Sequence, residues 1–231
     1  IVGDLVPGEV GRRRRARFFA RRTAAGAVLG FHSQASHMIV QLAECPIMSP
    51  EIVALLPPLR RLVERLFAVG VQVEIAVTAC HNGLDVTFYA PDEPEMSARV
   101  ALAEFAEIHD LARLSWSLTG DGATAEPVVR RRAASIRFGD VVVEPPPDAF
   151  LQPTEAGEAA LRVRIEDALG GTQRIADLYA GCGAFALPLA SAGRHVFAID
   201  NAADHIAALE NSARSSGFGP FVRTEIRDLH H

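Results

Sequence analysis

The sequence contains no lysine, so all 23 of its basic side chains are arginine. It has only three cysteines, Cys45, Cys80 and Cys182, and this odd, widely spread set argues against a disulfide framework and for a reducing cytosol. No apolar run approaches the eighteen or so residues that a membrane span needs. Signal peptides, repeats and low-complexity tracts are also not visible. These absences predict a globular cytoplasmic protein with no membrane contact, and we expect a monomer.

What is present is typical of a globular protein: 49% hydrophobic and 22% charged residues in a chain of 231, enough for one large or two modest domains. The charge is unevenly spread. Residues 1–22 carry seven arginines against Asp4 and Glu9, whereas the whole chain has a net charge of −5. A basic stretch on an acidic body fits a polyanion that is contacted locally, and it fits a solvated arginine-rich strand about as well.

The first part of the chain mixes strands with two helices. Strands are expected at 14–22, 27–32 and 38–42, in "QVEIAVTA", "LDVTFYA" and "ARLSWSL", and on both sides of Gly139-Asp140. His81-Asn82-Gly83 is a hairpin signal. One helix begins after Ser49 with Pro50 at its first position, and Pro57-Pro58 is expected to split it. A second helix is expected over 95–108. The pattern predicts an α+β domain over residues 1–147, which the prolines of "EPPPD" end.

After these prolines the pattern changes. A helix is expected over 154–169, with Thr154 as its cap, and strand, helix, strand, helix and strand then follow up to about residue 228. Such strict alternation indicates a parallel sheet covered by helices. Residues 148–231 are therefore predicted to form an α/β domain, with the domain boundary near 147.

The segment "DLYAGCGAF", Asp177 to Phe185, runs from a predicted strand through a glycine turn into a helix. Its "GCGAFA" satisfies the dinucleotide fingerprint G-x-G-x-x-G/A, which makes NAD one alternative. However, Asp177, Asp200 and Asp228 all come at strand ends. Three carboxylates there suit a ligand with an ammonium, a sulfonium and a ribose, and they repel a pyrophosphate. We therefore favour S-adenosylmethionine, although a tight turn or a helix cap would explain each residue taken singly.

Three spaced segments resemble the RNA uracil-C5 methyltransferase family. "DLYAGCGAFALPLA" resembles its first motif, D-L-[FY]-x-G-x-G-[TN]-F-x-L-x-L-A, and "DAFLQPTEAGEAAL" resembles the F-x-Q-[VP]-N segment that leads into its catalytic domain. The string "LGF…SHMIV…CPI" resembles the central domain, in the version found in ribosomal RNA enzymes rather than the transfer RNA branch. The resemblance covers essentially the whole chain. It implies an incomplete Rossmann-like class I methyltransferase domain, S-adenosylmethionine as cofactor, and RNA as partner, with large-subunit ribosomal RNA favoured.

The resemblance also implies roles for individual residues. Gln152 matches a glutamine that approaches both the cofactor and the target base, and Tyr179 matches the aromatic residue of the first motif. Asp200 matches the acidic residue on the ribose, and Asp228 matches a polar position near the adenine. Ala184 departs from the usual Thr or Asn, which removes a side-chain hydrogen bond to the methionine moiety. The predicted cofactor-binding residues are Gln152, Asp177, Tyr179, Gly181, Gly183, Asp200 and Asp228.

Uracil C5 is a poor nucleophile, and the family solves this with a cysteine thiolate that adds to C6, after which C5 attacks the methyl group. The target base must first leave its stack. No catalytic residue is assigned in this chain, because Cys182 lies inside the cofactor turn and Cys80 lies in a hairpin. The nucleophile and the base are expected after His231, since residues 174–231 hold only about two βαβ units. We expect this fragment to be inactive by itself.

Two further expectations concern metal and RNA. The resemblance implies that Cys45 is the fourth ligand of a [4Fe–4S] cluster if three upstream cysteines exist, and the alternative is a small buried core cysteine. The predicted RNA-binding residues are Arg13, Arg15, Arg17 and Phe18, because guanidinium groups bind phosphates and aromatic rings stack on bases. Alternation places the three arginines on one face of a strand and Arg14, Ala16 and Phe18 on the other.

His32 and His37 have no metal-ligand spacing, and we interpret them as ordinary polar or core histidines. Two rival functions remain open at this point. One is a NAD-type oxidoreductase, and the other is a non-catalytic RNA-binding protein with a degenerate methyltransferase half.

Overall fold

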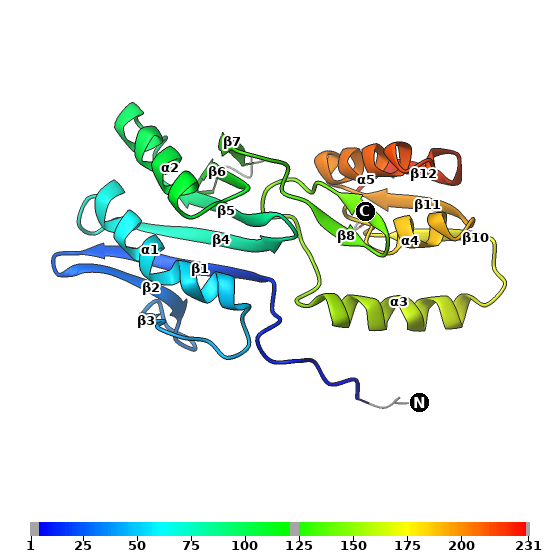
Figure 1. Ribbon diagram of the computed structural model, residues 1–231, viewed down its shortest axis with the longest axis horizontal. Helices are drawn as coiled ribbons and strands as arrows, with labels where there is room; N and C mark the ends of the chain where they lie inside the picture. The colour runs from blue at the N-terminus through cyan, green and yellow to red at the C-terminus, as the bar shows by residue number, and fades with distance from the viewer. Residues whose placement is uncertain (1–4, 121–124, 230–231) are drawn as a thin grey trace. The chain divides into compact units, whose positions relative to one another are not determined.

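The computed structural model describes residues 5–120 and 125–229 and shows two compact units (Figure 1). The first unit runs from Glu9 to Ala134. The second contains the described residues from Ser135 onward, together with the segment that ends at Gly8. Among the described helices, none is both long and apolar enough to cross a membrane.

A mixed seven-stranded sheet organises the first unit. In chain order its elements are β1 (Arg15–Thr23), β2 (Gly26–His32), β3 (Ile39–Gln41), α1 (Pro50–Leu66), β4 (Gln72–Cys80), β5 (Gly83–Ala90), α2 (Met96–Ile108), β6 (Arg113–Leu118) and β7 (Glu126–Arg130). The strand order is β3-β2-β1-β4-β5-β6-β7. Only β5 and β6 are parallel, and α2 is the crossover between them. The α+β architecture expected for this part of the chain is thus present.

Helix α1 is continuous through Pro57 and Pro58, so the expected split is wrong. Neither proline can donate the backbone hydrogen bond of a helix interior, which normally breaks a helix. The buried residues Ile52, Leu55, Leu56, Leu59, Leu62 and Val63 keep one helical phase on both sides of the prolines. Packing of this single apolar stripe against the sheet therefore outweighs the two missing bonds.

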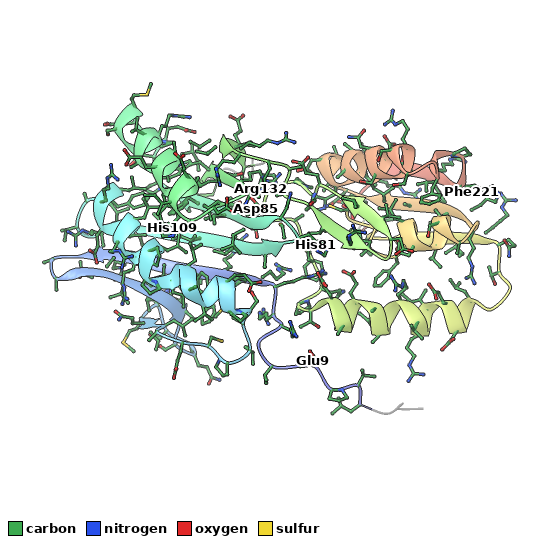
Figure 2. All side chains as sticks on the ribbon, in the orientation of Figure 1. Glu9, His81, Asp85, His109, Arg132 and Phe221 are labelled. Carbon is green, nitrogen blue, oxygen red and sulfur yellow. The ribbon has the colours of Figure 1, made fainter. Side chains whose placement is uncertain are left out.

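Strand β1 alternates between core and surface as the sequence predicts. Ala16, Phe18 and Ala20 are buried in the core, whereas Arg17 and Arg21 are exposed. On this second face of the sheet, Asp85 of β5 (labelled in Figure 2) accepts two hydrogen bonds from its register partner Arg113, at 2.9 and 2.7 Å. Both side chains are at least 95% buried, so the pair fixes the alignment of β5 and β6.

The second unit begins with a hairpin of β8 (Ile136–Phe138) and β9 (Val141–Val143), which turns at Gly139-Asp140 as predicted. Then follow α3 (Glu155–Leu169), β10 (Arg174–Leu178), α4 (Ala186–Ser191), β11 (His195–Asp200), α5 (Ala203–Ser215), the short 3₁₀ helix η1 (Gly219–Phe221) and β12 (Val222–Ile226). The strands are parallel in the order β10-β11-β12, and α4 and α5 pack on this sheet. The predicted α/β fold class is confirmed.

The two units divide between Ala134 and Ser135, earlier than the expected boundary near residue 147. The β8–β9 hairpin accounts for the difference, because β9 packs against α4 and α5 of the second unit. Its residues Ile136, Phe138, Val141 and Val143 are almost fully buried. The proline run thus follows this hairpin within the second unit.

Candidate functional site

The glycine turn connects the end of β10 to the start of α4, beside the end of β11. The N–H of Ala180 donates to the carbonyl of Ile199 at 3.0 Å, which ties the turn to the neighbouring strand. Three residues of the turn have positive φ: Tyr179 at 59°, Gly181 at 53° and Gly183 at 91°. Because Tyr179 is not glycine, this conformation is strained, and such strain is concentrated at functional sites.

The two glycines of the turn have different physical roles. A Cβ atom on Gly183 would lie 2.9 Å from the Cγ atoms of Leu187 and Leu209, so this glycine allows the turn to pack against α4 and α5. A Cβ atom on Gly181 would meet nothing within 4 Å. Gly181 therefore leaves its backbone accessible on the open side of the turn, where a ligand can approach it closely.

Asp200, at the carboxyl end of β11, joins the two strand-to-helix connections. Its Oδ2 accepts the N–H of Gly181 at 2.8 Å, and its Oδ1 accepts the N–H of Ala202 at 2.9 Å, just before α5. The side chain is 92% buried. Asp200 thus holds the turn in place and carries a negative charge at the same point.

Asp177 lies near the end of β10, and its carboxyl group is half-buried. Burial raises the pKa of Asp177 to about 6, while the N–H of Ala186 opposes the rise and the Asp200 carboxylate adds to it. Within the described part of the chain, Oδ2 of Asp177 is buried without a hydrogen-bond partner. A buried carboxylate oxygen with no partner, beside a second carboxylate, is an arrangement that a bound cation would stabilise.

The remaining predicted cofactor residues lie at three places. Asp228 is exposed just beyond β12, next to Arg227, whose N–H donates to the carbonyl of Asp200 at 2.9 Å. The side chain of Tyr179 is 58% exposed in the turn. Gln152 precedes α3 and lines a cavity of about 350 Å³ with Pro7, Gly8 and the first turns of that helix. The structure thus brings the ends of β10, β11 and β12 together.

Cys182 does not have the properties of a nucleophile. Burial raises the pKa of its thiol to about 12, and the carboxylates of Asp204 and Asp200 act in the same direction. Its side chain is 96% buried. A thiol held in this protonated state is inert. This agrees with the sequence-based expectation that Cys182 is not the nucleophile.

The arginine-rich strand is only partly as expected. Phe18 is fully buried, so its assignment as an RNA-contacting residue is wrong, and it belongs to the core instead. The guanidinium of Arg17 pairs with Glu74 at 3.0 Å and lies 4.7 Å from the ring centre of Tyr89. Arg13 is exposed, and Arg15 is half-buried. The aromatic ring on the arginine face of β1 is Phe19, which alternation from Arg17 could have identified.

Among residues 5–120 and 125–229, no group of three or more metal-binding side chains comes together. Cys45 is half-buried and packs at the edge of the first unit's core. These residues alone do not fit an iron–sulfur cluster, which requires about four ligands.

The chain is similar in sequence to proteins named RNA methyltransferases. An uncharacterised RNA methyltransferase of Mesorhizobium japonicum is 38% identical over 186 residues, which are 80% of this chain and 43% of that protein. The 23S rRNA (uracil(1939)-C(5))-methyltransferase RlmD of Thiobacillus denitrificans is 31% identical over 187 residues, 77% of this chain and 43% of that protein. The chain thus spans less than half the length of these relatives. No protein-family model matches it.

Among solved structures, the tRNA (uracil-54, C5)-methyltransferase of Pyrococcus abyssi, in complex with S-adenosyl-L-homocysteine, matches with a TM-score of 0.73 and 18% identity. The match covers 96% of this chain and 57% of that one. The parallel unit therefore has the Rossmann-like fold of methyltransferases. The named sequence relatives confirm the resemblance that the motifs indicated: the chain is related to proteins named RNA methyltransferases, which include a uracil-C5 methyltransferase.

Proposed function

We propose that this chain is part of an enzyme that transfers a methyl group from S-adenosylmethionine to C5 of a uracil in RNA. The observation that carries the proposal is the pair of carboxylates, Asp177 and Asp200, beside the strained glycine turn. The kinship with proteins named RNA methyltransferases supplies the RNA substrate class.

Charge supports a cationic cofactor over a dinucleotide. A pyrophosphate at the turn would meet the Asp200 carboxylate, whose Oδ2 already accepts a hydrogen bond from the N–H of Gly181. That N–H is one of the amide donors that a phosphate would need. A ligand with an ammonium and a sulfonium instead gains from both carboxylates, and Oδ2 of Asp177, which has no hydrogen-bond partner among the described residues, offers it an acceptor.

The residues that would hold the cofactor can be assigned roles. We propose that Gly181 gives the backbone approach, Gly183 the packing of the turn, and Asp177 the negative charge beside the methionine end. Asp200 would bind the ribose hydroxyls, and Tyr179 would cover the ligand. Gln152 and Asp228 complete the proposed set, as the family resemblance implies.

The cofactor supplies an electrophilic methyl group when bound. The resemblance implies that a cysteine thiolate activates the uracil by adding to C6, and Cys182 is unsuited to this because its thiol is buried and protonated. On the RNA side, we propose contacts from Arg13, Arg15 and Arg17. Ribosomal RNA is favoured as substrate because one relative carries that activity in its name. Cys45 remains a proposed cluster ligand, for which residues other than those described would have to supply the partners.

Calorimetric titration tests the cofactor. We expect S-adenosylmethionine and S-adenosylhomocysteine to bind and NAD not to bind. Asp200→Asn should weaken binding about tenfold or more, because it removes charged hydrogen bonds. Asp167→Asn on the exposed surface of α3 is the matched control, since it loses the same charge away from the turn. Tight NAD binding without binding of S-adenosylhomocysteine would overturn the proposal in favour of an oxidoreductase.

The reaction is tested with the full-length protein and RNA that carries tritium at uracil C5. Methylation at C5 must expel this hydrogen, so tritium release into water that depends on S-adenosylmethionine identifies the position of the methyl group. RNA binding without tritium release would favour the non-catalytic RNA-binding alternative.

A further inference from the structure

A stack of aromatic side chains lies on the arginine face of the first unit, outside the cofactor site. The rings of Phe19 on β1 and His32 on β2 are stacked, with centroids 3.8 Å apart and planes 16° apart. His37, in the connection from β2 to β3, meets His32 edge-on at 6.1 Å. Phe19 and His32 are half-buried and His37 is exposed, so the stack keeps solvent-accessible surface.

The sheet itself produces this arrangement. Phe19 lies directly opposite Gly30 on β2, and His32 is the next residue along β2 on the same face. A Cβ atom on Gly30 would lie only 1.9 Å from the carbonyl oxygen of Val40, so β3 requires glycine there. Because Gly30 has no side chain, the ring of Phe19 can lean across β2 onto His32. Nε2 of His32 is buried without a hydrogen-bond partner among the described residues, and the ring of His32 is in stacking contact with Phe19.

Two arginines of β1 lie on the same face of the strand as Phe19. Arg17 and Arg21 lie two residues before and after Phe19, on the same face of the strand. Glu74 forms an ion pair with Arg17, which compensates its charge. Arg21 instead donates a hydrogen bond to the amide oxygen of Gln72 at 2.7 Å, and this neutral partner does not compensate its positive charge. Arg21 thus adds a positive charge to the face of the sheet that carries the aromatic stack, and on a chain with a net charge of −5 this combination favours an anion that also carries flat rings.

We propose that Phe19 and His32 form a stacking platform for an unpaired base of the RNA, with Arg21 on the adjacent phosphate. This inference rests on the proposed function, since RNA is the partner in both. Base pairing hides the faces of neighbouring bases inside a helix, so the platform selects single-stranded segments or bases turned out of a stem. The platform positions the RNA and takes no part in the methyl transfer.

The test measures binding of the full chain to a fluorescent single-stranded RNA of about 12 nucleotides, a length within the usual site size, and to the same RNA annealed to its complement. Phe19→Leu keeps an apolar side chain but removes the ring. It should weaken single-strand binding about fivefold or more, the lower end of the contribution of a base–aromatic stack, and leave duplex binding unchanged. Phe19→Tyr keeps the ring and should bind like the wild type.

Arg21→Gln is expected to weaken binding of both RNA forms and to flatten the salt dependence, because it removes a phosphate contact. Phe19→Trp provides a second measurement if the leucine variant folds poorly. The native Trp116 is 95% buried, so quenching of a new, partly exposed indole at position 19 by single-stranded RNA would report stacking directly.

The possible failures are distinguishable. If the wild type binds single-stranded RNA and Phe19→Leu binds it equally well, or the indole is not quenched, the platform is wrong and the proposed function stands. If the wild type binds S-adenosylhomocysteine but no RNA, the RNA part of the proposed function fails, and the platform fails with it.

Discussion

Asp177 is a half-buried acid beside a second carboxylate, and this position sets how the glycine turn responds to pH. Its pKa is raised to about 6 from the ordinary value of 3.8, chiefly by burial. The folded protein therefore holds the proton more tightly than the unfolded chain does. The stability that protonation of this group contributes is fully present below about pH 4 and is lost as the pH rises through about 6.

A cationic ligand favours the ionised form of Asp177, whereas folding alone favours the protonated form. We expect the affinity for S-adenosylmethionine to fall as the pH is lowered from 7.5 towards 5, and Asp177→Asn to lose most of this pH dependence. The same substitution should raise the free energy of unfolding at pH 7 by roughly 1–3 kcal/mol, since it removes a buried charge. Calorimetry and urea unfolding at several pH values measure both effects.

Asp167→Asn, at an exposed position, should change neither profile. An unchanged pH dependence of binding in Asp177→Asn would show that this carboxylate does not face the ligand.

At the scale of elements, helix α1 shows how packing can outweigh local preference. Pro57 is exposed, so its ring contributes little to the core. At this interior position it removes a donor to the carbonyl of Val53 and crowds that carbonyl. We expect Pro57→Ala to raise the free energy of unfolding by about 1–3 kcal/mol, as measured by urea denaturation. A lower stability would mean that the two prolines stabilise α1 by restricting the unfolded chain.

The elements that the sequence predicted well are those in which local and tertiary signals agree. Thr154 caps α3, as its side chain accepts the N–H of Gly157 at 3.0 Å, and the hairpin at His81-Asn82 is present. Strand β7 is not among the strands expected from the sequence. It contains Pro127, a residue that argues against a strand, but β7 is an edge strand of its sheet, where a missing donor is tolerated. Pairing partners far apart in sequence decide such cases, and periodicity does not reveal them.

In the candidate site too, residues with local sequence signals could be predicted, whereas contacts that depend on strand pairing could not. The ends of β10, β11 and β12 meet as the β-α-β-α-β alternation required, so Asp200 could be placed at the glycine turn from sequence. The stacking of Phe19 on His32 could not be predicted from the sequence, because it depends on the register of β1 against β2 and on the glycine at position 30. Two histidines with no metal-ligand spacing give no signal until the strands are paired.

At the scale of the whole molecule, the two units differ in how much they bury. The large apolar cluster, which includes Phe18, Leu59, Phe88 and Trp116, lies entirely within the first unit. In the second unit, Glu158 is the one residue of α3 that is buried. A hollow of about 620 Å³ opens on its sheet, where the ring of Phe221, labelled in Figure 2, lies 5.2 Å from that of His195.

This difference predicts unequal local stability, which hydrogen exchange measured by mass spectrometry can resolve. Amides of α3 and β10 should exchange first, because few buried apolar contacts hold them. Amides of β4 and β5, at the centre of the seven-stranded sheet, should exchange last. Equal protection of both units would contradict this expectation.

The same measurement, repeated with S-adenosylmethionine, connects stability to the proposed site. A ligand that binds only the folded state protects the segments it contacts by an amount set by its concentration relative to its Kd. We expect added protection at residues 179–186 and at the end of β11, where the turn and Asp200 meet, and none in the β8–β9 hairpin. Protection that appears instead in the first unit would place the ligand away from the glycine turn, and the assignment of Asp177 and Asp200 would then be wrong.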